Sequence, residues 1–264
     1  MKSFLIQISS FKVSMTLMTV ALLCSFSAAD AVITVDQNAP EYHDGDAYYS
    51  IYDINKSSAN FEATAFLTTD ASGNSVDITA YNDGNITANS DNPYASVHTS
   101  LTLAQAGKLT YNPGNDKDGE DGEDDYVAFY LSANQQGSST DNFYGIDKLE
   151  IYTSSSATVD SIKDACHGEI AYSFDSHETG QLELFYGNGN SNWDVVLYVP
   201  LDNFKLINND YQQTYVHFIL NTYTDTAGPD SWIYDSNNDS LVPEPSSALL
   251  IALGGLVSLF KRRR

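Results

Sequence analysis

The stretch KLEIYTS, at residues 148–154, alternates its side chains with a period of two. Leu149 and Ile151 fall on one side of an extended chain, and Glu150 and Tyr152 fall on the other. This period is typical of a β-strand that turns one face toward a core. The stretch therefore predicts a strand, and similar stretches recur along the chain.

The middle of the chain is a series of such short segments, rich in Tyr, Phe, Val, Ile and Thr, with Asn, Asp, Gly and Ser clusters between them. Together they predict an all-β fold, an antiparallel β-sandwich or a jelly-roll-like domain. One stretch, residues 156–166, predicts a helix with Ser156 or Thr158 as its cap. With no repeat and no linker, residues 30–241 are interpreted as one domain. The predicted strands lie at 46–54, 61–70, 75–81, 107–113, 125–133, 148–154, 169–176, 181–188, 193–201 and 214–223.

Charge is distributed unevenly over the 264 residues, whose formal net charge is −23. Between Asp30 and Pro245 there are six lysines and all 35 acidic residues, so this middle carries 6 − 35 = −29. Such a surface repels nucleic acid and anionic lipid, which excludes a nucleic-acid partner. It suits a soluble extracellular domain that meets cations or a hydroxyl-rich partner.

The N-terminus has the three parts of a secretory signal peptide. Lys2 and Lys12 give a positive start, an apolar run follows, and small residues allow cleavage after Ala29 or Ala31. Residues 1–29 are therefore predicted to be a signal helix that is removed on export. Removal takes away Cys24 and leaves one cysteine, so the mature chain is expected to have no internal disulfide.

The densest acidic cluster is NDKDGEDGEDD, residues 115–125, with seven carboxylates among ten residues from position 116. Calcium takes several oxygen ligands, which carboxylates on a glycine-containing turn supply. The candidate ligands are Asp116, Asp118, Glu120 and Asp121, but Asp121 stands where an EF-hand loop needs glycine. The alternatives are an irregular calcium site and a solvated acidic loop. No other cofactor is predicted.

Candidates for catalysis are weak. Cys166, His167 and His177 do not match zinc spacing or a local Cys–His signature, and no G-x-S-x-G or phosphate-binding motif is present. Glu169 and Glu183 are one imaginable glycosidase pair among many acids. The chain is therefore predicted not to be an enzyme, with a carbohydrate-active enzyme as the alternative.

Aromatic residues offer another alternative, a glycan-binding module. Trp193, Trp232 and the 18 tyrosines could form a face on which sugar rings stack. Aromatic residues of β-sandwiches are more often core residues, so this interpretation remains an alternative to a structural surface protein.

The C-terminus has three parts as well: VPEP, an apolar run at 246–260 and the basic end KRRR at 261–264. The 15-residue run spans about 22 Å as a helix, short of the ~30 Å hydrocarbon core. It can still span a locally thinned bilayer, with the basic end in the cytoplasm and the acidic domain outside. Pro243 and Pro245 keep Glu244 in an extended segment at the membrane surface.

Residues 242–264 resemble the PEP-CTERM sorting signal. The resemblance covers this tail only, and it implies export by a Gram-negative bacterium and processing by an exosortase, a membrane protease or transpeptidase. Pro243, Glu244 and Pro245 would be the recognition element, and none would be catalytic. It implies a transient stay in the inner membrane, then a place at the cell surface or outside the cell, in association with matrix or exopolysaccharide.

Overall fold

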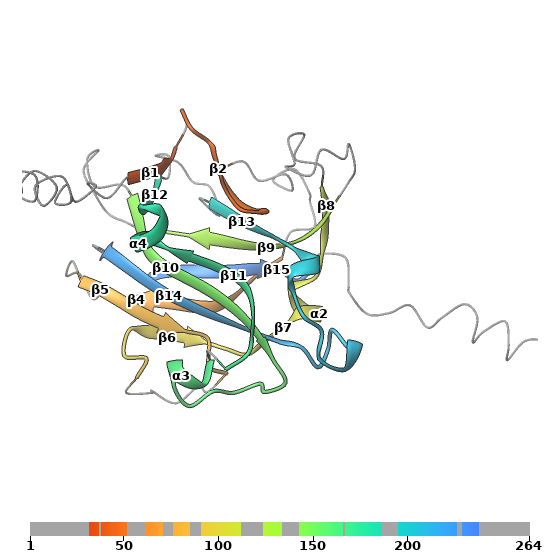
Figure 1. Ribbon diagram of the computed structural model, residues 1–264. Coiled ribbons are helices and arrows are strands. Elements are labelled where there is room, and N and C mark those ends of the chain that lie inside the picture. The colour runs from red at the N-terminus through yellow and green to blue at the C-terminus, as the bar shows by residue number, and fades with distance from the viewer. Residues whose placement is uncertain are drawn as a thin grey trace, which may run out of the picture. The chain divides into compact units, whose positions relative to one another are not determined.

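The computed structural model describes residues 32–36, 38–51, 62–70, 76–84, 91–111, 124–133, 143–165, 167–185, 195–225 and 229–237 (Figure 1). The predicted signal peptide and the sorting tail at 242–264 lie outside these residues, so both stay predictions. Within the described residues, no helix is long and apolar enough to span a membrane.

Two β-sheets account for most of the described chain. Sheet A has the order β1-β12-β10-β14-β5, with β11 beside β10 and β7 beside β14. Its strands are β1 (Val32–Val35), β5 (Val76–Tyr81), β7 (Leu101–Thr102), β10 (Phe143–Ser154), β11 (Glu169–Asp175), β12 (Gln181–Phe185) and β14 (Tyr215–Asp225).

Sheet B has the order β2-β3-β13-β9-β15-β4-β6, with β8 beside β9. Its strands are β2 (Glu41–Asp44), β3 (Ala47–Ser50), β4 (Ala63–Asp70), β6 (Ala95–His98), β8 (Leu109–Tyr111), β9 (Asp124–Ser132), β13 (Val195–Pro200) and β15 (Pro229–Asp235). The helical segments are short: α2 (Leu103–Ala106), α3 (Ile162–Ala165), α4 (Ser176–Thr179), η1 (Leu201–Asn203) and η2 (Ile207–Asn209).

Both sheets are antiparallel except at one edge, where β1 runs parallel to β12. The described sheets are thus mostly antiparallel, in agreement with the prediction. The chain changes from sheet A to sheet B between β1 and β2. Asp36 accepts hydrogen bonds from the backbone nitrogens of Asn38 and Ala39, which holds the turn that carries the chain from sheet A to sheet B.

Each of the ten predicted strand segments contains a strand, so the all-β prediction is confirmed. KLEIYTS is the second half of β10, and the side chains of Leu149 and Ile151 are buried as predicted. The helix predicted at 156–166 is shorter, because α3 begins only at Ile162. Val159 instead donates its backbone N–H to Asp83, and the hydroxyl of Ser161 accepts from the backbone of Asp164 at the helix start.

The main core lies between the two sheets and is built on aromatic rings. The Phe218 ring of sheet A lies 5.4 Å from the Phe66 ring and 4.8 Å from the Trp232 ring of sheet B, centroid to centroid. All three side chains are fully buried. Such packing fixes how the sheets face each other without a disulfide among the described residues.

Cross-sheet hydrogen bonds add to this core. The hydroxyl of Tyr172 in β11 donates to Asp44 at 3.0 Å and lies 3.1 Å from the hydroxyl of Tyr49 in β3. Burial raises the pKa of Tyr172 and the pKa of Tyr49 far above the ordinary value for tyrosine. Both phenols therefore stay protonated and remain available as donors.

The outer faces of the two sheets differ. On sheet B a tyrosine cluster of Tyr48, Tyr126, Tyr130 and Tyr198 is buried, and the Tyr48 and Tyr198 rings stack at 4.6 Å. On sheet A, the segment around α3 covers one end of the outer face, where Val159 and Ala165 pack against Tyr81 and Ile219. Glu183 of β12 and Tyr223 of β14 lie toward the other end of that face.

Candidate functional site

The predicted calcium ligands Asp116, Asp118, Glu120 and Asp121 lie outside the described residues, as do Pro243, Glu244 and Pro245 of the sorting motif. The calcium site and the sorting element therefore stay predictions. Among the described residues, no group of three or more His, Cys, Asp or Glu side chains is arranged to hold a metal ion.

Glu169 and Glu183, the glycosidase pair considered from the sequence, are held far apart. Both lie along the same edge of β10, where Glu169 is paired with Thr153 and Glu183 with Gly145. These partners are eight positions apart, which corresponds to about 26 Å along the strand. Two glycosidase carboxylates lie about 5–9.5 Å apart, so this pair does not form such a site.

The remaining sequence candidates do not converge either. Trp232 is fully buried in the main core and cannot stack on a sugar, while Trp193 lies outside the described residues. Cys166 lies outside them as well. His167 is exposed and 3.9 Å from Asp164, and His177 is exposed in α4.

A buried polar cluster lies where the chain crosses from sheet A to sheet B and back. β5 ends at Tyr81, and the next residues, Asn82 and Asp83, leave sheet A before β6 joins sheet B. β7 then returns the chain to sheet A. Asn82 and Asp83 are almost completely buried, so their polar groups need partners within the protein.

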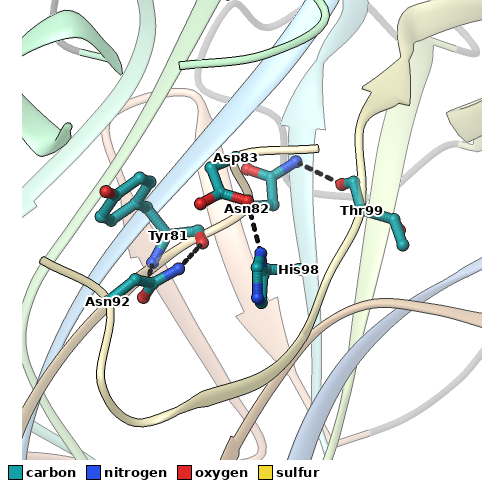
Figure 2. Close-up of polar contacts among 6 residues, drawn as sticks. All are labelled: Tyr81, Asn82, Asp83, Asn92, His98 and Thr99. Atoms are coloured by element: carbon teal, nitrogen blue, oxygen red, sulfur yellow. Dashed lines mark hydrogen bonds and ion pairs between the residues drawn. The ribbon is translucent and has the colours of Figure 1, made fainter. Parts of the chain in front are cut away.

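Asn82 takes the place of a strand residue beside β14. Its side-chain oxygen accepts from the backbone nitrogen of Phe218 at 2.6 Å, and its side-chain nitrogen donates to the carbonyl oxygen of Val216 at 2.9 Å. The same nitrogen donates to the carbonyl oxygen of Thr99 at 3.3 Å (Figure 2). One carboxamide therefore satisfies backbone groups in the gap between β5 and β7.

Asn92 protects the outer edge of β5 in a similar way. Its side chain accepts from the Tyr81 backbone nitrogen at 3.2 Å and donates to the Tyr81 carbonyl oxygen at 2.7 Å (Figure 2). β5 is the last strand of sheet A, and an unpaired edge invites association with another strand. The amide closes that edge at its end.

Asp83 and His98 form another part of the cluster. Figure 2 shows the Asp83 carboxylate pointing to Nδ1 of the His98 ring, and the two groups form a short hydrogen bond. Asp83 is fully buried and His98 is 6% exposed. A carboxylate that orients an imidazole is a common part of catalytic sites, but here the pair is closed off from solvent. Its geometry fits a structural link between the two sheets.

A second histidine, His217 of β14, lies on the outer face of sheet A. Its Nε2 atom is 2.6 Å from the Ser154 hydroxyl and 3.1 Å from the Ser156 carbonyl oxygen. The carbonyl can only accept, so we assign the ring proton to Nε2. In that tautomer Nε2 cannot remove the proton of Ser154. Burial lowers the pKa of His217, which keeps the ring neutral, and the pair anchors the end of β10 rather than activating a nucleophile.

Sequence reasoning missed these clusters because their members are distant along the chain or belong to different sheets. Asn82 and Asp83 follow a predicted strand, and their position at a strand end was the only local signal. No protein-family model matches the chain, and neither a curated protein nor a solved structure matches it. The function is therefore argued from the residues.

Proposed function

We propose that the chain is an exported, non-enzymatic surface or matrix protein that an exosortase-type membrane enzyme sorts through its tail. The observation that carries the proposal is the order of Pro-Glu-Pro, a short apolar run and a basic end within residues 242–264. The tail would hold the precursor in the inner membrane until processing. The mature domain, jelly-roll-like in its finer topology, would then function at the cell surface or outside the cell, in contact with exopolysaccharide.

Features of the described domain support this setting. The region of the chain between Asp30 and Pro245 carries a net charge of −29, from six lysines and 35 acidic residues. Such a charge keeps a protein soluble and discourages binding to anionic polymers. The core of the described domain is large and rich in aromatic residues. The one carboxylate pair considered for glycoside hydrolysis is about 26 Å apart along β10. The non-enzymatic role is therefore preferred to a carbohydrate-active enzyme.

The proposal is tested by the ends of the mature protein. Mass spectrometry of the surface-exposed or released form should find an N-terminus near Asp30 or Val32 and no peptide from residues 246–264. Replacing Pro243, Glu244 and Pro245 by alanine should leave insertion intact but hold the full-length protein in the membrane. Replacing Ser246 and Ser247 by alanine is the matched control and should leave processing unchanged. Recovery of peptides that reach Arg264 from the released wild-type form would refute the proposal.

A further inference from the structure

The outer face of sheet A contains, at the end away from α3, a tyrosine ring that lies flat on the sheet. Tyr223 of β14 is the direct neighbour of Gly145 in β10. A Cβ atom placed on Gly145 would lie 2.7 Å from Cζ of Tyr223 and 2.8 Å from both Cε atoms. Three nearly equal distances mean that the ring presents its face, and not its edge, to the glycine. The opposite ring face therefore points away from the sheet.

The absence of a side chain at Gly145 is what allows this arrangement. Glycine weakens the interior of a strand, and it is found there where another group must come close. Any larger residue would lift the Tyr223 ring off the sheet. The Tyr223 side chain as a whole is partly exposed.

Two acidic residues lie on the strands at Gly145. Glu183 of β12 is the neighbour of Gly145 on the other side from Tyr223. Burial and the charges of Glu183 and Asp147 raise the pKa of Tyr223. Asp147 lies at the bulge of β10, where Ser176 donates to its Oδ1 atom at 3.2 Å.

Two of these side chains are positioned by neighbouring groups. Gly145 leaves room for the Tyr223 ring to lie against the sheet, and Ser176 at the start of α4 donates a hydrogen bond to Asp147. A platform that is rigid before binding loses little conformational entropy when a ligand arrives. The arrangement therefore has the properties of a prepared surface site.

We propose that Tyr223, Glu183 and Asp147 form a binding site for a neutral pyranose unit of a polysaccharide. The C–H groups on one side of a pyranose ring carry partial positive charge, and the π-face of Tyr223 carries negative charge, so the two stack. The carboxylates accept hydrogen bonds from the sugar hydroxyls, and charge-assisted bonds of this kind are the stronger ones.

Charge decides the class of sugar. The carboxylates of Glu183 and Asp147, on a region of net charge −29, repel uronate and sulfate groups. A neutral polymer is free of this repulsion. The inference rests on the proposed function, in which the mature domain meets extracellular polysaccharide, and it names the kind of polymer and the residues that bind it.

The test is affinity electrophoresis of the purified mature protein in native gels. The probes are four neutral polymers, dextran, hydroxyethylcellulose, galactomannan and laminarin, and one polyuronate, alginate. At least one neutral polymer should retard the wild-type protein, and alginate should not. Tyr223→Leu should weaken the affinity about tenfold, because it removes the aromatic face but keeps an apolar cover over Gly145.

Tyr215→Leu is the matched control, since Tyr215 is a partly buried tyrosine on the same strand and the same face, about 26 Å away. It should leave retardation unchanged.

Glu183→Gln is a second variant of nearly equal shape, and it should weaken binding even if Tyr223→Leu fails to fold. Lack of retardation by all four neutral polymers, equal retardation by alginate, or equal effects of the Tyr223 and Tyr215 substitutions would each overturn the proposal. Because the ends of the mature protein are measured separately, this failure is distinguishable from a failure of the sorting proposal.

Discussion

Asp83 and His98 connect the two sheets at the side where the edge strands β5 and β6 lie. Asp83 follows β5 of sheet A, and His98 is the last residue of β6 in sheet B. Elsewhere the sheets are held mainly by apolar packing, so this pair is a polar link at one margin of the sandwich. Because both side chains are buried, neither partner gains a full hydration shell if the other is removed.

Removing the carboxylate of this pair should therefore be costly. We expect Asp83→Ala to lower the free energy of unfolding by about 2–4 kcal/mol, since it leaves a buried imidazole without its partner. Urea denaturation measures the change. His167→Ala is the control, because His167 is exposed and only 3.9 Å from Asp164, and it should change the value by less than about 0.5 kcal/mol. Similar values for the two variants would contradict the structural role of the pair.

Gly45 and Gly84 have nearly the same backbone conformation, so substituting each by alanine distinguishes the cost of backbone strain from the cost of steric clash. Gly84 has φ 68° and Gly45 has φ 65°. A Cβ atom at Gly84 would lie 2.4 Å from the Ala157 carbonyl oxygen, whereas nothing lies within 4 Å at Gly45. Gly45→Ala should cost about 1 kcal/mol for the backbone conformation alone. Gly84→Ala should cost about 1–3 kcal/mol more, for the displaced backbone. Equal losses in thermal unfolding would show that the segment around Ala157 moves away freely.

The hydroxyl of Tyr172 is expected to contribute to the contact between the sheets. Tyr172→Phe removes its hydrogen bonds to Asp44 and Tyr49, and it should lower the free energy of unfolding by about 1–2 kcal/mol. Tyr215→Phe, at a partly exposed position, is the control and should be nearly neutral. Chemical denaturation of the two variants decides whether the bond matters.

The neutral state of His217 makes stability depend on pH. Burial lowers the pKa of His217 below the 6.5 of an unfolded chain, so below this pH the unfolded state binds a proton that the folded state resists. The folded state therefore loses stability as the pH falls below about 6.5. His217→Gln keeps a side-chain donor but does not titrate. The difference in unfolding free energy, wild type minus variant, should become smaller between pH 7.5 and pH 5. A difference that is constant over this range would mean that His217 is not held neutral.

The strands were predictable from the sequence because the alternation of Leu149, Glu150 and Ile151 is local. The sheet partners were not, since Val32 pairs with Gln181, 149 positions away, and nothing in either segment encodes the other. β15 was missed because it begins with proline and two polar residues, although its later residues Trp232 and Ile233 are buried.

The site around Tyr223 was also only partly predictable from the sequence. The isolated Gly145 inside β10 was a usable signal of close approach. The identity of the approaching group depends on the register between β10 and β14, which is a property of the tertiary fold. The Asp83–His98 pair likewise depends on two sheets meeting, and its residues carry no motif.

The order of the strands in the two sheets also determines when the domain can complete its folding. β14 lies between β10 and β5 in sheet A, and β15 lies between β9 and β4 in sheet B. Neither sheet can be completed until these two strands, within the last 50 residues of the chain, are available. A chain exported as predicted would cross the membrane before either sheet is complete, in the unfolded form that a secretion channel accepts. Such distant pairings make folding slow. In a chain exported in this way, the late position of β14 and β15 would delay completion of both sheets until most of the domain has crossed the membrane.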